Sequence, residues 1–171
     1  MKKLLLVGIV ALSITTANAQ TPFTTTIDKN NVTILNGIVA KSDIANNAAF
    51  SNWYGANQNN YRPDTSVTNA MANTKDKVQY VVFGGTWCED TQFILPKFFK
   101  LQEQSGLSES HLSLYAVDRS KKTLGNIADA FKITNVPTII VMKDGKEIGR
   151  VVEYGKTGKW DIELGQILSG L

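Results

Sequence analysis

The sequence is short of sulfur and of soft metal ligands. Its 171 residues include one cysteine, Cys88, and one histidine, His111. A single cysteine excludes a disulfide within the chain, so an apolar core alone must hold the fold. One cysteine and one histidine without ligand spacing do not make a metal site. Glycine-rich phosphate and dinucleotide signatures are absent as well, so the sequence predicts neither a metal nor another cofactor.

A large excess of charge of one sign is also missing. The chain has 18 basic and 15 acidic residues and a formal net charge of +3. Loss of Lys2 and Lys3 with the N-terminal segment described next would lower the basic count from 18 to 16. This balance gives no electrostatic reason to expect nucleic acid as a partner.

Residues 1–19 have the pattern of a secretory signal peptide. A basic start, Met1-Lys2-Lys3, precedes a short apolar run, and Ala17-Asn18-Ala19 matches a cleavage site. The apolar run is shorter than the roughly 20 residues that span a bilayer. We therefore expect cleavage after Ala19, a periplasmic or secreted location, and no stable membrane insertion afterwards. An uncleaved N-terminal anchor is the alternative.

The stretch 78–101 carries the main functional signal. Its apolar run 78–83 predicts a buried strand, which Gly84 and Gly85 interrupt. A helical pattern begins at Cys88, with apolar residues spaced for one buried face: Ile94, Phe98 and Leu101. The only cysteine is thus predicted at the N-terminus of a helix. That position favours a thiolate, whereas the neighbouring Glu89 and Asp90 oppose it, so we expect modest activation.

The motifs around this stretch resemble those of the thioredoxin-like superfamily. Trp87-Cys88 is followed eight residues later by Pro96 in the same predicted helix. Further on, Asn135-Val136-Pro137-Thr138 resembles the family's cis-proline loop, and Asp144-Gly145 its hairpin turn. The likeness covers roughly residues 75–171. It implies an α/β three-layer sandwich with a mixed central sheet.

The same resemblance implies where a substrate would lie. In the family the proline loop faces the cysteine and pairs with the substrate backbone. Trp87, Val136 and Pro137 would then line the substrate groove, with the Val136 backbone contacting a peptide. The alternative for Pro137 is that it merely begins an edge strand.

Two positions depart from the family pattern. Thr91 stands where the family has its resolving cysteine, and Val82 where it has a buried carboxylate. A dithiol enzyme needs that second sulfur to release a mixed disulfide. We therefore predict a monothiol thiol–disulfide oxidoreductase, with Cys88 as the nucleophile and the Thr91 hydroxyl stabilising its thiolate. Its partners would be protein or small-molecule thiols and disulfides.

Two other functions remain open from the sequence. The groove could serve a non-catalytic module that binds an extended peptide. Cys88-Glu89-Asp90-Thr91 also faintly resembles the Cys-x-x-Thr of peroxidase-like relatives of this fold, which would make the protein a thiol peroxidase.

Residues 20–74 are predicted to form a mostly helical extension that packs on the core. Residues 21–31 would be a polar lead-in, and 32–35 a short strand. A helix is expected from Ser42 toward Trp53, then a linker over 57–64 and a second helix from Pro63-Asp64. Three aromatic residues would pack this extension on the core or, alternatively, line the groove beside Cys88: Trp53, Tyr54 and Tyr61.

After the central helix the pattern predicts a strand over 111–117, a helix over 123–131, a hairpin around Asp144-Gly145 and a final helix over 160–168. Asp118 and Arg119 follow the strand and are interpreted as a solvated pair, with a place near the site as the alternative. His111 should lie at the opposite end of the sheet from Cys88.

Overall fold

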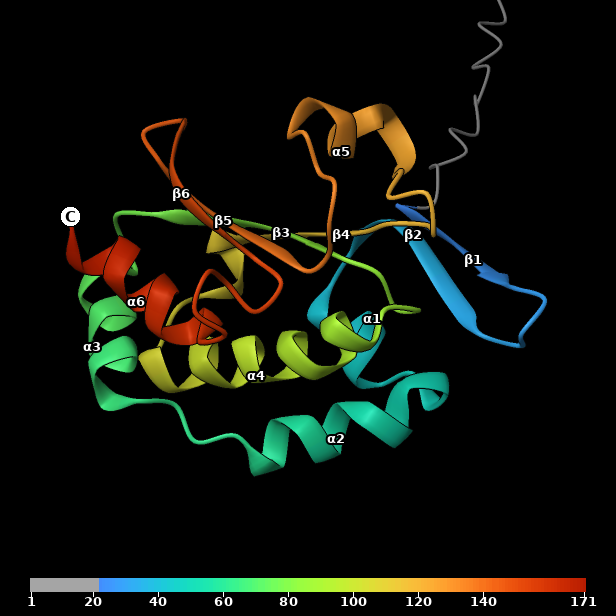
Figure 1. Cartoon of the computed structure of the whole chain (residues 1–171), viewed down its shortest axis with the longest axis horizontal. Helices are drawn as coiled ribbons and strands as arrows, with labels where there is room; N and C mark the ends of the chain where they lie inside the picture. The colour runs from blue at the N-terminus through green and yellow to red at the C-terminus, as the bar shows by residue number, and fades with distance from the viewer. Residues whose placement is uncertain (1–21) are drawn as a thin grey trace, which may run out of the picture.

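The computed structural model describes residues 22–171. The predicted signal peptide lies outside these residues. A six-stranded sheet in the order β1-β2-β4-β3-β5-β6 forms the middle layer. Figure 1 shows this sheet between α5 on one side and α4, α3 and α6 on the other, with α2 lying against α4. The predicted three-layer α/β fold is confirmed.

The sheet is mixed, as predicted. Its centre is a parallel pair, β3 (Gln79–Gly84) and β4 (Leu112–Ala116). The other neighbours are antiparallel: β5 (Thr138–Lys143) pairs with β3, and β6 (Lys146–Val152) with β5. On the far side of β4 the sheet is extended by β2 (Thr33–Val39) and β1 (Phe23–Ile27). The loops that follow β3 and β4 therefore emerge at one end of the sheet.

Six α-helices and three 3₁₀ turns surround the described sheet. In the extension these are α1 (Lys41–Ala45), η1 (Ala48–Phe50), α2 (Ser51–Asn60) and α3 (Thr65–Thr74). The rest are α4 (Glu89–Ser105), η2 (Glu109–His111), η3 (Leu124–Asn126), α5 (Ile127–Ala130) and α6 (Trp160–Ser169).

The extension differs from its prediction in three places. The segment expected as a lead-in contains β1, whose side chains are mostly exposed because it is an edge strand with one neighbour. The expected helix from Ser42 is broken, since the Asn47 side chain accepts the N–H of Ala49 at 3.0 Å and starts a new turn. Helix α2 then continues to Asn60, through half of the predicted linker.

The predicted helix over 123–131 is also broken. Gly125 and Asn126 have positive φ values of 77° and 58°, so a 3₁₀ turn and a short helix replace one continuous helix. The final helix is confirmed, and its three predicted apolar positions are buried: Trp160, Leu164 and Leu168.

The sheet has an apolar core on each face. Val82 and Leu114 point to the larger core, which α4 closes with Ile94 and Phe98. Phe83 points to the smaller core under α5. This alternation follows from the strand period of two. Trp53 and Tyr54 belong to the larger core, where they pack with residues of α4 such as Phe99.

Helix α4 contains Pro96, which has no N–H for the carbonyl four residues earlier. That carbonyl belongs to Gln92, and it accepts a hydrogen bond from Nδ2 of Asn57 in α2 at 3.1 Å. The helix ends at Gly106, whose φ of 69° lies in the left-handed region. The extension thus provides a partner for the backbone group that Pro96 leaves unpaired.

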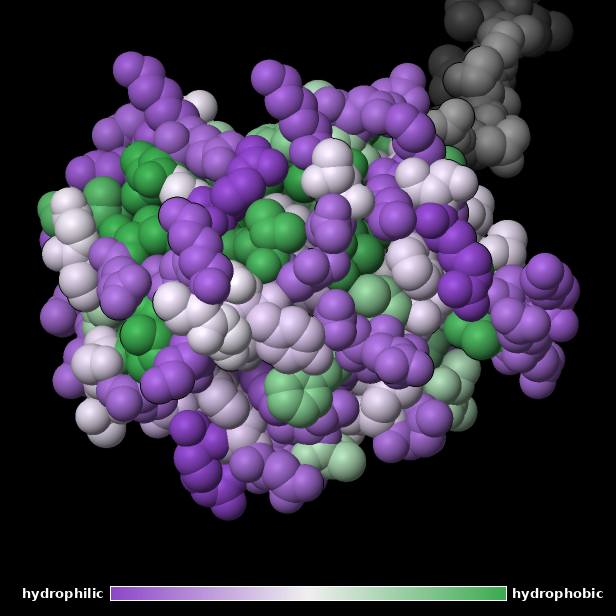
Figure 2. All heavy atoms as spheres, in the orientation of Figure 1, coloured by the Kyte–Doolittle hydropathy of each residue, from purple (hydrophilic) through white to green (hydrophobic). Residues whose placement is uncertain are grey.

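Hydrophilic side chains cover most of the face seen in Figure 2, and hydrophobic ones appear there in separate clusters. No helix among residues 22–171 is long and apolar enough to cross a membrane.

Candidate thiol site

Cys88 lies where β3 gives way to α4. It is the N-cap residue of α4, with extended dihedrals of φ −95° and ψ 123°, and it is partly exposed. Its N–H donates to the Gly85 carbonyl at 2.9 Å, and its carbonyl accepts the N–H of Gln92 at 2.9 Å. A tight turn thus presents the thiol at the end of the sheet.

The sulfur faces the proline loop. The Cys88 thiol donates to the Val136 carbonyl at an Sγ–O distance of 3.2 Å. The Val136–Pro137 peptide bond is cis. Both loop residues are buried, and Val136 is only 2 % exposed. The structure therefore brings Cys88 and this loop together, with the Val136 backbone carbonyl against the thiol.

Trp87 is held from several directions. Its indole Nε1–H donates to the Val117 carbonyl at 2.9 Å. Gly85 lies under the ring, where a Cβ would come within 2.7 Å of the indole. The guanidinium carbon of Arg119 lies 5.2 Å from the ring centroid. The glycine that the sequence marked as a strand end is thus needed for close approach of this indole.

Thr91 is 1 % exposed, one turn into α4. Its hydroxyl oxygen accepts the N–H of Gly85 at 3.2 Å. In the described part of the chain no hydrogen bond joins this hydroxyl to the Cys88 sulfur. The structure gives Thr91 a role in closing the turn before Cys88, and its action on a thiolate stays a prediction.

Glu153, which sequence reasoning missed, anchors the proline loop. Its backbone N–H donates to the Pro137 carbonyl at 2.7 Å, and its carboxylate accepts from Asn135 Nδ2 at 2.9 Å. Its φ of 51° lies in the left-handed region, which is unusual for a residue other than glycine. No sequence pattern marks a glutamate for that conformation.

Tyr154 was also missed, and it lies in the turn after β6, packed against α4. Its ring centroid lies 5.8 Å from that of Phe93 in α4. Partial burial, then a hydrogen bond to Asp90, raise the pKa of Tyr154, and the charges of Asp90, Cys88 and Glu89 add to the shift. The phenol of Tyr154 and the carboxylates at the start of α4 therefore interact electrostatically.

The structure corrects the interpretation of Asp118 and Arg119 as a solvated pair, because Arg119 contacts Asp28 and Trp87. Its Nε and Nη2 donate to one carboxylate oxygen of Asp28, at 2.8 and 2.6 Å, and it covers Trp87. His111 lies at the other end of the sheet, as expected, with Nδ1 2.9 Å from the carbonyl of Val78.

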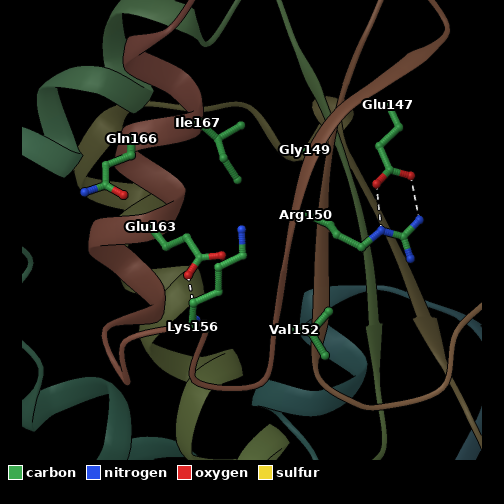
Figure 3. A pocket seen from close by; sticks show the side chains of 9 residues that line it. Glu147, Gly149, Arg150, Val152, Lys156, Glu163, Gln166 and Ile167 are labelled. Carbon is green, nitrogen blue, oxygen red and sulfur yellow. Dashed lines mark hydrogen bonds and ion pairs between the residues drawn. The ribbon is translucent and has the colours of Figure 1, made fainter.

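A shallow hollow of about 810 Å³ lies between β6 and α6 (Figure 3). Three of its charged side chains have partners: Arg150 pairs with Glu147, and Glu163 accepts the backbone N–H of Lys156. Neither Trp87 nor Cys88 lines it. Within residues 22–171 no three metal-ligating side chains come together.

Comparison with known proteins matches residues 62–161 to the thioredoxin family. Thioredoxin-1 of Saccharomyces cerevisiae is 32 % identical over 81 residues, which are 47 % of this chain and 73 % of that protein. Thioredoxin H3 of Arabidopsis thaliana is 32 % identical over 85 residues, 50 % of this chain and 67 % of its own length. A solved Pseudomonas aeruginosa protein of unknown function has a similar fold: its TM-score is 0.52 at 15 % identity, over 75 % of this chain and 89 % of that one.

Proposed function

Because the chain belongs to the thioredoxin family, we propose that it is a monothiol thiol–disulfide oxidoreductase with Cys88 as its nucleophile. One observation carries the proposal. Cys88, the only cysteine of the chain, is partly exposed at a helix N-terminus. Its sulfur lies 3.2 Å from the Val136 carbonyl oxygen in the Pro137 loop. Helix N-termini favour the thiolate, which is the reactive form of cysteine.

The reaction has two exchange steps. The Cys88 thiolate attacks one sulfur of a substrate disulfide, the substrate S–S bond breaks, and the departing thiolate takes up a proton from water. Cys88 is then joined to the other half of the substrate as a mixed disulfide. Because no second cysteine is present, a thiolate from another molecule attacks the substrate sulfur of this mixed disulfide and releases Cys88 as thiolate. The second thiol belongs to a protein or a small molecule.

The neighbouring residues support this reaction in different ways. Thr91 and Gly85 close the turn that presents the thiol. The Val136 carbonyl is the group that a substrate peptide would meet once the thiol has been consumed, since it currently accepts from Sγ. Trp87 and the Pro137 loop flank the sulfur and would bound the groove.

The test is capture of a peptide disulfide by the purified protein. Incubation should add one peptide half to Cys88, detected by mass spectrometry, and added thiol should remove it. Cys88→Ser should abolish the adduct. Peptide binding that persists unchanged in Cys88→Ser, with no adduct in the parent protein, would instead identify a non-catalytic binding module. Peroxide consumption with an added thiol would identify a peroxidase.

We also propose that the protein works in the periplasm or outside the cell. The basic start, short apolar run and Ala17-Asn18-Ala19 support this location. N-terminal sequencing of the protein from its native source should give Gln20 as the first residue. A mature chain beginning at Met1 would contradict the proposal.

A further inference from the structure

The hairpin of β1 and β2 reaches the loop that carries Cys88. The Thr86 hydroxyl donates to the Thr33 carbonyl at 2.9 Å and accepts the N–H of Leu35 at 3.2 Å. Thr86 is buried. Two strand residues of the extension therefore fix the backbone two positions before the thiol.

A second connection starts at Asp28, in the turn between β1 and β2. One oxygen of its carboxylate accepts the N–H groups of Asn30 and Val32 at 2.8 and 3.0 Å, which orders the turn. The other oxygen accepts both Nε and Nη2 of Arg119. The Val32 N–H, followed by Arg119, holds the pKa of Asp28 below its ordinary value. The carboxylate is thus charged at neutral pH, and both of its oxygens accept hydrogen bonds.

Arg119 carries this connection to Trp87. Its guanidinium group lies 5.2 Å from the indole centroid, within the range of a cation–π contact. The contact to Asp28 through two nitrogens fixes the plane of the guanidinium, which a lysine in its place could not reproduce. The loop behind it is ordered by Asp118, whose carboxylate accepts the N–H groups of Ser120 and Lys122 at 2.8 and 3.0 Å.

From these contacts we propose that Asp28 is a positioning residue for the Cys88 reaction, acting through Arg119 on Trp87. Trp87 is bonded to Cys88, so a displaced indole moves the thiol relative to the Val136 carbonyl 3.2 Å away. A partly exposed ion pair like this one contributes little to stability by itself. Loss of the Asp28–Arg119 pair should therefore change the position of Trp87 and the rate at which Cys88 reacts more than it changes the free energy of unfolding.

The proposal rests on the proposed function for its rate measurement only, because the environment of Trp87 can be measured separately. Asp28→Asn is the main variant, since it keeps an oxygen for the turn and removes the charge. Asp64→Asn is the matched control. Asp64 lies in the same extension, and its carboxylate accepts the N–H of Ser66 at 2.8 Å at the start of α3. Both are compared where circular dichroism shows a fully folded protein.

Two quantities are measured: tryptophan emission, and the rate at which Cys88 reacts with an aromatic disulfide reagent. Asp28→Asn should shift the emission and slow the reaction about two- to fivefold. The emission shift should vanish when Trp87 is replaced by phenylalanine. Arg119→Gln should give the same slowing, and the double variant with Asp28→Asn should be no slower than either. Asp64→Asn should leave both quantities unchanged.

Equal emission and equal rates in Asp28→Asn and Asp64→Asn would overturn the proposal. An emission shift without slowing would also overturn it, because the hairpin would then place Trp87 with no effect on the thiol. If Asp28→Asn does not fold, Arg119→Gln, in an exposed loop, decides by the same criteria. An unreactive Cys88 in the parent protein would refute the proposed function, while the emission would still decide whether Asp28 places Trp87.

Discussion

Replacing Thr91 with valine should destabilise the fold and leave the Gly85 amide without a hydrogen-bond partner. Valine keeps the shape of threonine but removes the oxygen that accepts the Gly85 N–H at 3.2 Å. Both residues are buried, so water cannot replace the lost partner. An unpaired buried N–H costs about 1–3 kcal/mol. For a chain of this size that corresponds to a decrease in Tm of roughly 2–4 °C per kcal/mol.

Urea unfolding followed by circular dichroism measures this loss, and an unchanged m-value would show that the compactness of both states is preserved. Hydrogen exchange at the Gly85 amide separates the bond from packing, because protection should fall in Thr91→Val and persist in Thr91→Ser. Serine keeps the oxygen and loses only a methyl group. A valine variant with parental stability and a protected Gly85 amide would refute this reasoning.

The same two variants test the predicted action of Thr91 on the thiolate. If the hydroxyl turns toward Cys88 during reaction, Thr91→Val should slow alkylation of Cys88 and Thr91→Ser should not. Equal alkylation rates in both variants would leave Thr91 with its structural role alone.

Three further predictions concern the loops around the thiol. Gly85→Ala should destabilise the protein by about 1–3 kcal/mol in urea unfolding and shift tryptophan emission, because the added Cβ would lie 2.7 Å from the Trp87 indole; parental emission would contradict this. Glu153→Gly should be about 1 kcal/mol more stable than Glu153→Ala, since both lose the bond to Asn135 but only glycine relieves the positive φ; equal midpoints would speak against strain there. The pKa of Asp28 is lower in the folded protein than its ordinary value of 3.8, so its stabilising contribution should be complete above pH 3.8 and lost as the pH falls through the folded-state pKa. When the free energy of unfolding is measured against pH, an Asp28→Asn variant should lack this loss.

The central part of the fold was predictable because its sequence signals are strong and local. The apolar run before Gly84 and the helical spacing after Cys88 each select one structure. The resemblance of Asn135-Val136-Pro137-Thr138 to the family's proline loop then implied that this loop faces the cysteine. Strand β1 was missed because its Thr-rich sequence has no apolar alternation, and only its pairing with β2 makes it a strand.

The residues around the thiol were predictable in part. Trp87 and Cys88 are neighbours in sequence, so local reasoning could place them. Arg119 and Asp28 are 91 positions apart, and no periodic pattern connects an edge hairpin with a loop across the sheet. Glu153 reaches the proline loop through its backbone, which carries no side-chain signal.

The hydrogen bond from Asn57 to the carbonyl that Pro96 leaves free has a consequence for how much of the chain is dispensable. A chain shortened to begin at residue 75 would retain the thiol and the proline loop. In that shortened chain the Gln92 carbonyl would lose its hydrogen-bond partner, and β4 would lose its neighbour β2. The core side chains that α2 and α3 cover would become exposed. The sequence boundary near residue 75 is therefore a poor place to cut, because the hairpin and helices before it complete the sheet and the core.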